Sequence, residues 1–360
     1  MDSTPPPSTR PRPCPSPPGP PAHPPAGGAD VARVGPLFGI AAELTDLQVL
    51  GGGHIHDTFL ATYDDGARWI HQRVNESVFT DVDLLMANVA RVTVHLAGPV
   101  RLRPAADGRP YARDPAGAPW RTLAFIDGTR AGARFDRPEE AVEGAALAAA
   151  FVAGLADLDP PPAEVIPGFH DVVARLGHLQ DAQAADACGR AAACGAEVDA
   201  VLGHAGVATT VAEARAAGVL PERTVHNDTK VENLLFDAAT GAGVCLVDLD
   251  TVGPGTVLFD VGDLVRSGAV RAAEDGDPAA LTVDQGIVDA VFAGYAGAGF
   301  LTPGEVDLLP LAGPLMALEA AARFLTDYLE GDVYFRITDA DHNLRRARNQ
   351  LRAVELLLAG

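Results

Sequence analysis

Several side chains that could bind a metal ion or move a proton gather in the short stretch HNDTKVEN, residues 226–233. Asp228 could accept a proton, and Asn233 could offer a carboxamide oxygen to a metal ion. Asp248 and Asp250 follow at the end of the apolar segment VCLV. Two carboxylates and a carboxamide on a loop and a neighbouring strand can converge on one Mg²⁺ and leave room for phosphate oxygens. The spacing therefore favours metal-assisted chemistry on a phosphate compound.

The same stretch contains Lys230, the only lysine of the chain; all other basic residues except the histidines are arginines. An ammonium group is a compact point charge, whereas the planar guanidinium of arginine is bulkier and favours bidentate geometry. At a transferring phosphoryl group, arginine would displace the phosphate or its acceptor. The one lysine therefore predicts a phosphate contact at residue 230.

The overall composition restricts the class of partner. The 360 residues carry a formal net charge of -21, and 48% of them are hydrophobic. So acidic a protein repels nucleic acids and anionic membranes, and we expect neither as a partner. We expect no membrane span, because no stretch approaches the roughly 20 continuous apolar residues that a span needs. With polyanions excluded, a small molecule is the expected partner. The four cysteines show no metal-ligand spacing and are typical of reduced thiols, so we expect a cytoplasmic protein.

The elements that must position these residues fall into two groups. Residues 30–128 favour an antiparallel sheet with one helix at 80–96, which Thr80 or Asp81 would cap. From Pro138 the chain becomes alanine-rich and helical, with one helical stretch at 172–217 and helices almost throughout after Asp260. We therefore predict an α+β fold with two lobes, a small β-rich lobe at 30–128 and a larger helical lobe at 129–360. The proline-rich residues 1–29 predict a disordered tail.

The stretch 226–233 resembles the catalytic loop of protein kinases, H-R-D-x-x-x-x-N, which a metal-binding aspartate follows. On this resemblance Asp228 is the catalytic base, and Lys230 contacts the transferring phosphoryl group. The metal-binding residues would be Asn233, Asp248 and Asp250. The bilobal fold would then be that of the protein kinases.

The small lobe offers candidates for binding the nucleotide. A turn of three glycines is typical of the segment that covers nucleotide phosphates, and here these are Gly51, Gly52 and Gly53. Arg73 follows on the third strand, where most kinases have a lysine. The partner of Arg73 stays open, because residues 84–96 include neither aspartate nor glutamate; Asn88, Asp81 or Asp83 could orient it.

More specifically, the chain resembles the N-acetylhexosamine 1-kinase group of the aminoglycoside phosphotransferase and choline kinase-like superfamily. The segments that carry this resemblance span most of the chain and include GGGHIHDTFL, HQRVNESVF, WRTLAFIDG, HNDTKVENLLFD, LVDLDTVGPGTVLFDVGDLVR and RFLTDYLEGDVYF. The resemblance implies ATP- and Mg²⁺-dependent phosphorylation of the anomeric hydroxyl of an N-acetylhexosamine. It also implies a hinge with Phe125 and Asp127 at the adenine, bracing of the catalytic loop by His226 and Asp260, and a sugar pocket lined by Asp228, Arg323, Tyr334 and His54.

Other functions stay open on the sequence. The acceptor could be an aminoglycoside, choline, homoserine or another sugar. A metal-dependent hydrolase could use the same carboxylates, but Cys14 has no sulfatase-type C-x-P-x-R setting. The absence of an acid at residues 84–96 also admits a nucleotide-binding pseudokinase.

Overall fold

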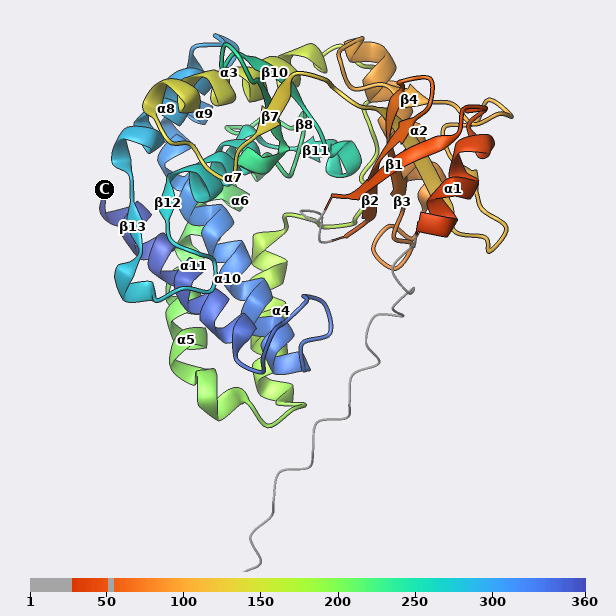
Figure 1. Ribbon diagram of the computed structural model, residues 1–360. Helices are drawn as coiled ribbons and strands as arrows, with labels where there is room; N and C mark the ends of the chain where they lie inside the picture. Colours follow the sequence, from red (N-terminus) through yellow and green to blue (C-terminus); the bar gives the residue numbers. More distant parts are fainter. Residues whose placement is uncertain (1–27, 51–54) are drawn as a thin grey trace, which may run out of the picture.

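The computed structural model of the protein describes residues 28–50 and 55–360 (Figure 1). The predicted tail therefore falls outside the described residues as far as residue 27. The glycine turn, Gly51, Gly52 and Gly53, and the neighbouring His54 also fall outside them.

An antiparallel sheet forms the small lobe, and its strands have the order β1-β2-β3-β6-β4, with β5 paired to β6. One face of the sheet packs against α1, around the buried side chains of Val34, Phe59 and Trp120. Because side chains alternate between the two faces of a strand, the residues between these apolar ones point to the opposite face, towards the larger lobe. The bounds are α1 Gly28–Leu37, β1 Leu44–Val49, β2 Asp57–Tyr63, β3 Arg68–Arg73, β4 Leu102–Arg103, β5 Ala112–Arg113 and β6 Pro119–Ala124.

Helix α2, Val82–Leu96, follows β3 and packs into the main core with Leu85, Met86 and Val89. Asp81 caps its first turn, since its carboxylate accepts a hydrogen bond from the Leu84 N–H at 2.9 Å. The N-cap is therefore Asp81 rather than Thr80.

The larger lobe is mostly helical and contains three small two- or three-stranded sheets (Figure 1). Its helices are α3 Pro138–Gly154, α4 Val172–Ala185, α5 Ala191–Gly203, α6 Ala205–Ala216, α7 Val257–Ala269, α8 Gln285–Ala296, α9 Pro303–Leu308, α10 Ala312–Glu330 and α11 His342–Ala359. Its strands are β7 Thr129–Ala131, β8 Arg223–Val225, β9 Leu234–Asp237, β10 Gly243–Leu246, β11 Gly253–Gly255, β12 Val270–Arg271 and β13 Thr282–Val283. The molecule is thus a mixed α+β protein with a small sheet and a larger helical part, as predicted.

Two segments differ from the expected helices. The stretch 172–217 is broken into α4, α5 and α6, because Asp186 ends α4 in the left-handed conformation and a turn with Gly189 follows. The hairpin β12–β13 interrupts the helices after Asp260.

Cys194 and Cys245 are free and buried, whereas Cys188 is disulfide-bonded, so the expectation of reduced thiols is wrong for Cys188.

Helix α10 runs through the core of the larger lobe, with Leu315, Leu318 and Leu325 fully or almost fully buried. Within the described residues, the stretch Pro303–Glu330 is long and apolar enough to cross a membrane by length and composition alone. Of its most apolar part, 72% is buried inside the protein. Burial in this core accounts for the apolar character of the helix.

Candidate active site

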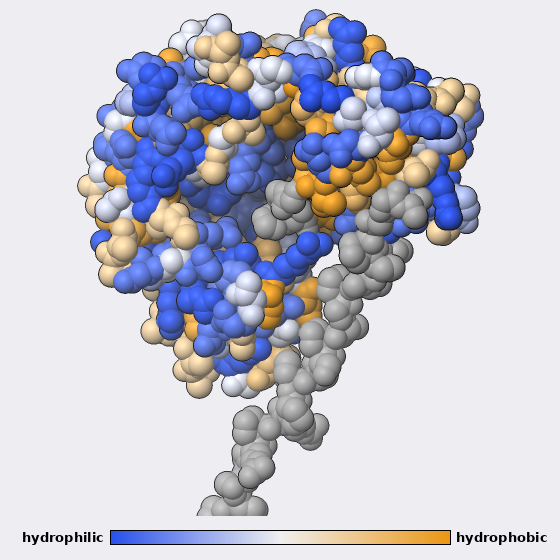
Figure 2. All heavy atoms as spheres, in the orientation of Figure 1, coloured by the Kyte–Doolittle hydropathy of each residue, from blue (hydrophilic) through white to orange (hydrophobic). Residues whose placement is uncertain are grey.

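A cleft of about 750 Å³ lies between the sheet of the small lobe and the catalytic loop of the larger one. Figure 2 shows this face of the molecule hollowed where the two parts meet. Apolar side chains from both lobes line much of the cleft, among them Ile70, Val89 and Leu235. The polar lining residues at the catalytic loop and the segment after β10 include Asp228, Lys230, Asn233, Asp248 and Asp250. The sheet contributes further polar side chains, among them Gln72 and Arg121.

The catalytic loop is held from below by Asp260, the buried carboxylate in the first turn of α7. Its two oxygens accept hydrogen bonds from the backbone N–H groups of His226 at 3.1 Å and Asn227 at 2.8 Å. The ring of His226 donates from Nε2 to the Val247 carbonyl at 2.9 Å. These hydrogen bonds fix the loop to α7 and to the segment after β10.

Asp228, at the centre of the loop, is half-buried and accepts two hydrogen bonds through Oδ2. Lys230 Nζ donates to it from 3.0 Å, and Asn233 Nδ2 donates from 3.0 Å. Asn233 Nδ2 also donates to the Asp228 carbonyl at 2.7 Å. The amide nitrogen of Asn233 is thereby oriented towards Asp228, and its carboxamide oxygen is left for a cation.

The charges at Lys230 keep its ammonium group protonated. Burial opposes the charged form, but the carboxylates of Asp228 and Asp248 outweigh burial and raise the pKa of Lys230 above its usual value. A protonated lysine beside the base can neutralise an incoming phosphoryl group.

Asp248 lies at the cleft end of the segment after β10, in the left-handed conformation with φ 64°. Asp248 is exposed, and it lines the cleft. Burial and the neighbouring carboxylates of Asp250 and Asp228 raise its pKa, which means that the site concentrates negative charge. A bound cation would offset this charge.

The donor set at this end of the cleft fits Mg²⁺. The ion prefers oxygen ligands and keeps open positions for phosphates and water when few protein groups bind it. Asp248 and the carboxamide oxygen of Asn233 supply two such ligands. The described residues contain no group of three or more His, Cys, Asp or Glu side chains arranged to hold a metal ion, so a metal here would depend on the nucleotide for its other ligands.

Asp250, expected to bind the metal ion, is paired with protein groups in the structure. Its carboxylate is buried and forms a bidentate ion pair with Arg121 of β6, with Arg121 Nη2 at 3.0 Å from Oδ2. His56 Nε2 lies 2.5 Å from the same Oδ2. Burial raises the pKa of Asp250, but Arg121 and His56 outweigh it and hold the pKa well below its usual range. The carboxylate is therefore already neutralised by protein groups.

Arg73 does not reach the cleft. It forms an ion pair with Asp57, directly opposite on β2, and neither side chain is among the residues lining the cleft. The side chain of the adjacent Gln72 lines the cleft instead, as strand alternation requires. The open question of the partner of Arg73 is answered by Asp57. Asp81 caps α2, Asp83 accepts from Tyr111, and Asn88 binds the backbone of Ala163.

At the expected hinge, Phe125 lines the cleft and Asp127 does not. Asp127 forms an ion pair with Arg68, whose guanidinium also lies over the Phe125 ring, 4.4 Å from its centroid. Phe125 is thus in place to contact an adenine, while Asp127 fixes the rim.

Arg323 and Tyr334, expected at the acceptor, line neither hollow among the described residues. The Arg323 guanidinium lies 5.4 Å from the ring centroid of Tyr334. It lies 5.4 Å from the ring centroid of Phe335 and 5.9 Å from that of Phe169. Tyr334 is 51% exposed. We call these four residues the arginine–aromatic cluster.

Two buried residues connect this cluster to the catalytic loop. Glu319 Oε1 lies 3.9 Å from Arg323 Nη1, and Glu319 Oε2 lies 2.7 Å from His170 Nδ1. His170 Nε2 donates to the Asn227 carbonyl at 2.8 Å. Burial lowers the pKa of His170, but Glu319 outweighs burial and raises it above its usual value. Each ring nitrogen faces an oxygen, one of Glu319 and one of Asn227. The sequence analysis did not single out His170 or Glu319, because they lie far apart in the chain and neither belongs to a motif that signals chemistry.

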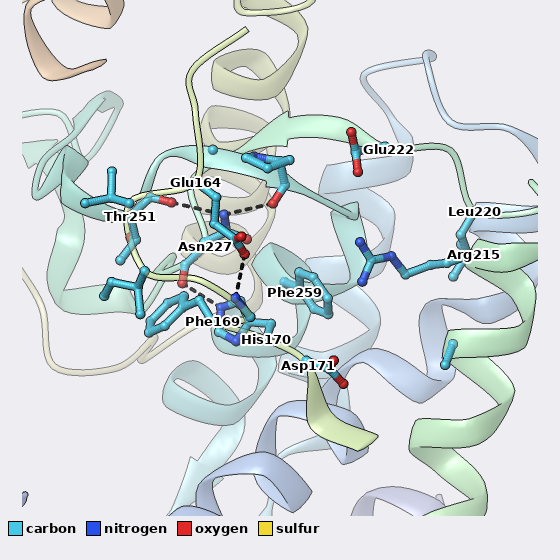
Figure 3. Close-up of a pocket in the computed structure, with 16 residues that line it drawn as sticks. Glu164, Phe169, His170, Asp171, Arg215, Leu220, Glu222, Asn227, Thr251 and Phe259 are labelled. Carbon is cyan, nitrogen blue, oxygen red and sulfur yellow. Dashed lines mark hydrogen bonds between the residues drawn. The ribbon is translucent and has the colours of Figure 1, made fainter. Parts of the chain in front are cut away.

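A second hollow, of about 500 Å³, flanks the catalytic loop from the larger lobe (Figure 3). Figure 3 shows His170 against the backbone of Asn227, with Phe169 and Phe259 on either side. Asp228 does not line this hollow. Asp228 lines the first cleft instead.

A two-lobed fold in which an aspartate, a neighbouring lysine and a second aspartate line one cleft is typical of small-molecule phosphotransferases. A model of the phosphotransferase enzyme family matches residues 46–301, and the chain belongs to this family.

Solved structures agree on the fold. The chain is similar to an aminoglycoside phosphotransferase from Alicyclobacillus acidocaldarius, with 14% identity over 93% of this chain and 95% of the other and a TM-score of 0.59. It is similar to a choline/ethanolamine kinase family protein from Mesorhizobium loti, with 18% identity, coverage of 91% and 98%, and a TM-score of 0.52. An amicoumacin kinase in complex with AMP-PNP and Ca²⁺ gives 12% identity, coverage of 85% and 87%, and a TM-score of 0.55.

Proposed function

We propose that the protein transfers the γ-phosphoryl group of ATP to the anomeric hydroxyl of an N-acetylhexosamine and forms the sugar 1-phosphate. Membership of the phosphotransferase enzyme family supports the reaction class, and the motif resemblance supports the sugar. The observation that carries the choice of acceptor is the arginine–aromatic cluster, which His170 and Glu319 link to the catalytic loop.

In the proposed reaction, Asp228 accepts the proton of the sugar hydroxyl while its oxygen attacks the γ-phosphorus. The bond between the γ-phosphorus and the bridging oxygen breaks, and ADP leaves. An anomeric hydroxyl is more acidic than an ordinary alcohol, which suits a weak carboxylate base. Lys230, now paired with Asp228, would also bond the transferring phosphoryl group, and a Mg²⁺ ion held by Asp248 and Asn233 would neutralise phosphate charge.

A neutral acceptor fits the cluster better than a cationic one. A quaternary ammonium ligand needs free aromatic faces, but the guanidinium of Arg323 already lies against all three rings. A second cation would meet like-charge repulsion there. A sugar acetamide or hydroxyl oxygen can instead accept a hydrogen bond from Arg323, and Tyr334 can pack on the sugar ring.

The test is a panel of acceptors, with ADP formation measured in the presence of ATP and Mg²⁺. We expect N-acetylglucosamine or N-acetylgalactosamine to give ADP well above the rate without acceptor, and choline and kanamycin to give none. Glucose and galactose are the matched controls, because each differs from its N-acetylhexosamine only by a hydroxyl in place of the acetamide. Activity with choline or an aminoglycoside alone would overturn the sugar proposal and leave the phosphotransferase class intact.

The position of the phosphate is a separate measurement. We expect the phosphorus signal of the product to couple to the anomeric proton. Phosphate on the C6 oxygen would contradict the anomeric assignment.

For Arg323→Met we expect KM for the sugar to rise about tenfold or more, since one hydrogen bond to a charged group is lost. KM for ATP is expected to stay within about twofold of wild type.

A further inference from the structure

The small lobe lacks two residues on which protein kinases rely for binding phosphate. The cleft-facing position of β3 is Gln72, which carries no charge. No aspartate or glutamate lies on α2 beyond Asp83, and Asp83 accepts a hydrogen bond from the Tyr111 hydroxyl at 2.7 Å. In kinases a β3 lysine and a glutamate on the next helix form an ion pair at this place. The cation and its acid must come from elsewhere.

Arg121 occupies the corresponding place from the neighbouring strand. It lies directly opposite Gln72 in the β3–β6 register, and both side chains line the cleft. Arg121 Nε donates to Gln72 Oε1 at 2.8 Å, and its two Nη atoms donate to Asp250. A guanidinium has five N–H groups, and these three bonds leave two N–H groups that phosphate oxygens can accept.

Asp250 joins this arginine to the larger lobe. Both side chains are almost completely buried, with 3% and 4% exposed. The bond crosses between the lobes, since Arg121 belongs to the sheet and Asp250 lies two residues after Asp248. Asp250 therefore fixes the guanidinium relative to the aspartate that faces the metal position.

His56 completes the arrangement as a hydrogen-bond donor. Its Nδ1 accepts a hydrogen bond from the Asn75 N–H at 3.0 Å, so the ring proton is on Nε2, which bonds Asp250. The ring also stacks on Phe79, with centroids 5.3 Å apart. The segment that follows the glycine turn is thus fastened to the same carboxylate as Arg121.

We infer that Arg121 is the nucleotide phosphate-binding cation of this enzyme, and that Asp250 is the positioning acid which holds it, in place of a lysine on β3 and an acid on α2. The inference rests on ATP as the donor, as in the proposed function, and is independent of the acceptor. Asp250 then acts through Arg121 and not as a metal ligand.

The test measures the binding of ADP to the full-length protein by titration calorimetry, once with Mg²⁺ and once with EDTA. We expect Arg121→Gln to weaken ADP binding about 30-fold or more, because it removes a cation from a buried charged pair. Adding Gln72→Lys to this variant returns a cation to the same place, and we expect it to restore at least about tenfold of the loss. Arg73→Gln is the matched control on the opposite face, expected within about twofold of wild type.

Asp250→Asn separates the positioning role from metal binding. We expect it to weaken ADP binding by the same factor with Mg²⁺ and with EDTA, because the arginine has lost its partner in both. A deficit that disappears in EDTA would make Asp250 a metal ligand and overturn its proposed role. Circular dichroism and the unfolding midpoint check each variant; if Arg121→Gln does not fold, Arg121→Lys with and without Gln72→Lys carries the same comparison.

Two results would overturn the role of Arg121: ADP affinity within twofold of wild type in folded Arg121→Gln, or no recovery on adding Gln72→Lys. The first makes the guanidinium irrelevant to phosphate, and the second makes it only a structural link between lobes. A wild-type protein that binds no ADP contradicts ATP as donor. A wild-type protein that binds ADP but phosphorylates no hexosamine contradicts the acceptor and leaves this inference standing.

Discussion

At the residue scale, Asp228 and Lys230 form an ion pair, with Nζ 3.0 Å from Oδ2. Their exposed fractions are similar, 27% and 29%, so both remain open to the cleft. When a phosphoryl group arrives, the ammonium can bond it without losing Asp228, because it has three N–H donors. The pair therefore provides the base and the compensating charge at one place.

Replacement of Asp228 by asparagine is the first prediction. Asn keeps the shape of the side chain and removes the group that accepts the proton, so we expect kcat to fall about 10²–10⁴-fold. The measurement is ADP release with the acceptor identified by the panel, alongside ADP binding. Loss of ADP binding together with kcat would point to a binding role for Asp228 and contradict its role as base.

Replacement of Lys230 by arginine tests the demand for a compact ammonium. We expect kcat to fall at least about tenfold, a difference of about 1.4 kcal/mol in the barrier, because the guanidinium displaces the phosphate or the acceptor. Arg113→Lys is a matched exchange at an exposed ion pair with Glu76, and it should leave kcat unchanged. Wild-type activity in Lys230→Arg would mean that catalysis does not require a lysine at this position.

His71 makes the stability of the small lobe depend on pH. It is fully buried, between the Tyr63 hydroxyl at 2.9 Å and Thr122 Oγ1 at 2.8 Å, and burial lowers its pKa from 6.5 to about 4. Between these two values the unfolded chain binds the proton and the folded one does not. Stability therefore falls as the pH decreases from 6.5 to 4, by up to about 3 kcal/mol for this group. The unfolding midpoint of His71→Gln should change less than that of wild type over this range; parallel curves would contradict the assignment.

At the scale of the elements, α7 and α10 must approach closely to place Asp260 under the catalytic loop. Gly262 permits this approach, since a Cβ there would lie 2.3 Å from the Ala312 carbonyl oxygen and 2.4 Å from Met316 Cγ. The two helices carry the bracing carboxylate and the residues that lead to the arginine–aromatic cluster. Their spacing thus sets the relation between base and acceptor side.

Gly262→Ala is therefore expected to destabilise the protein by about 2–3 kcal/mol through overpacking. Gly177→Ala in α4 is the control, because a Cβ there meets nothing within 4 Å; it should stabilise the protein by about 0.5–1 kcal/mol, since alanine favours the helix. Denaturant unfolding of both variants checks the prediction. Equal stability of the two would contradict the close packing of α7 on α10.

The antiparallel sheet of the small lobe and the N-cap of α2 could be predicted from local patterns. The cation of the small lobe could not. His71, Gln72 and Arg73 are all polar, so alternation alone cannot say which of them faces the cleft. Only the pairing of β3 with β6 brings Gln72 opposite Arg121, and that register depends on residues some 50 positions apart.

The catalytic loop was more predictable than its surroundings because its chemistry is local in sequence. Asp228, Lys230 and Asn233 lie within a few residues, and the structure brings them together. The links from the loop to Glu319 and to Asp250 join distant segments. Tertiary packing creates these links, and they cannot be predicted from residue spacing along the chain.

At the scale of the whole molecule, the formal net charge of -21 opposes the approach of an anionic nucleotide. The cations that would bind it, Arg121 and Lys230, act at short range inside the cleft. Salt screens the long-range repulsion, with a Debye length of about 8 Å at physiological ionic strength, and it screens the buried contacts much less. Long-range and local electrostatics thus act in opposite directions.

We therefore expect the association rate of ADP to rise about twofold between 20 mM and 150 mM salt, because screening removes repulsion. Stopped-flow measurement of nucleotide binding at several salt concentrations checks this. A rate that falls with salt would indicate a positively charged approach path and contradict the argument from net charge.

The solitary lysine has a practical consequence for covalent labelling. Lys230 and the terminal amino group are the only primary amines of the polypeptide. The raised pKa of Lys230 keeps it protonated and slow to react with activated esters, whereas the terminal amine has a pKa near 8 and reacts first. A second acyl group on the intact protein would therefore mark one position, beside the catalytic base, and bound nucleotide should protect it. Intact mass alone would then report occupancy of the phosphate site.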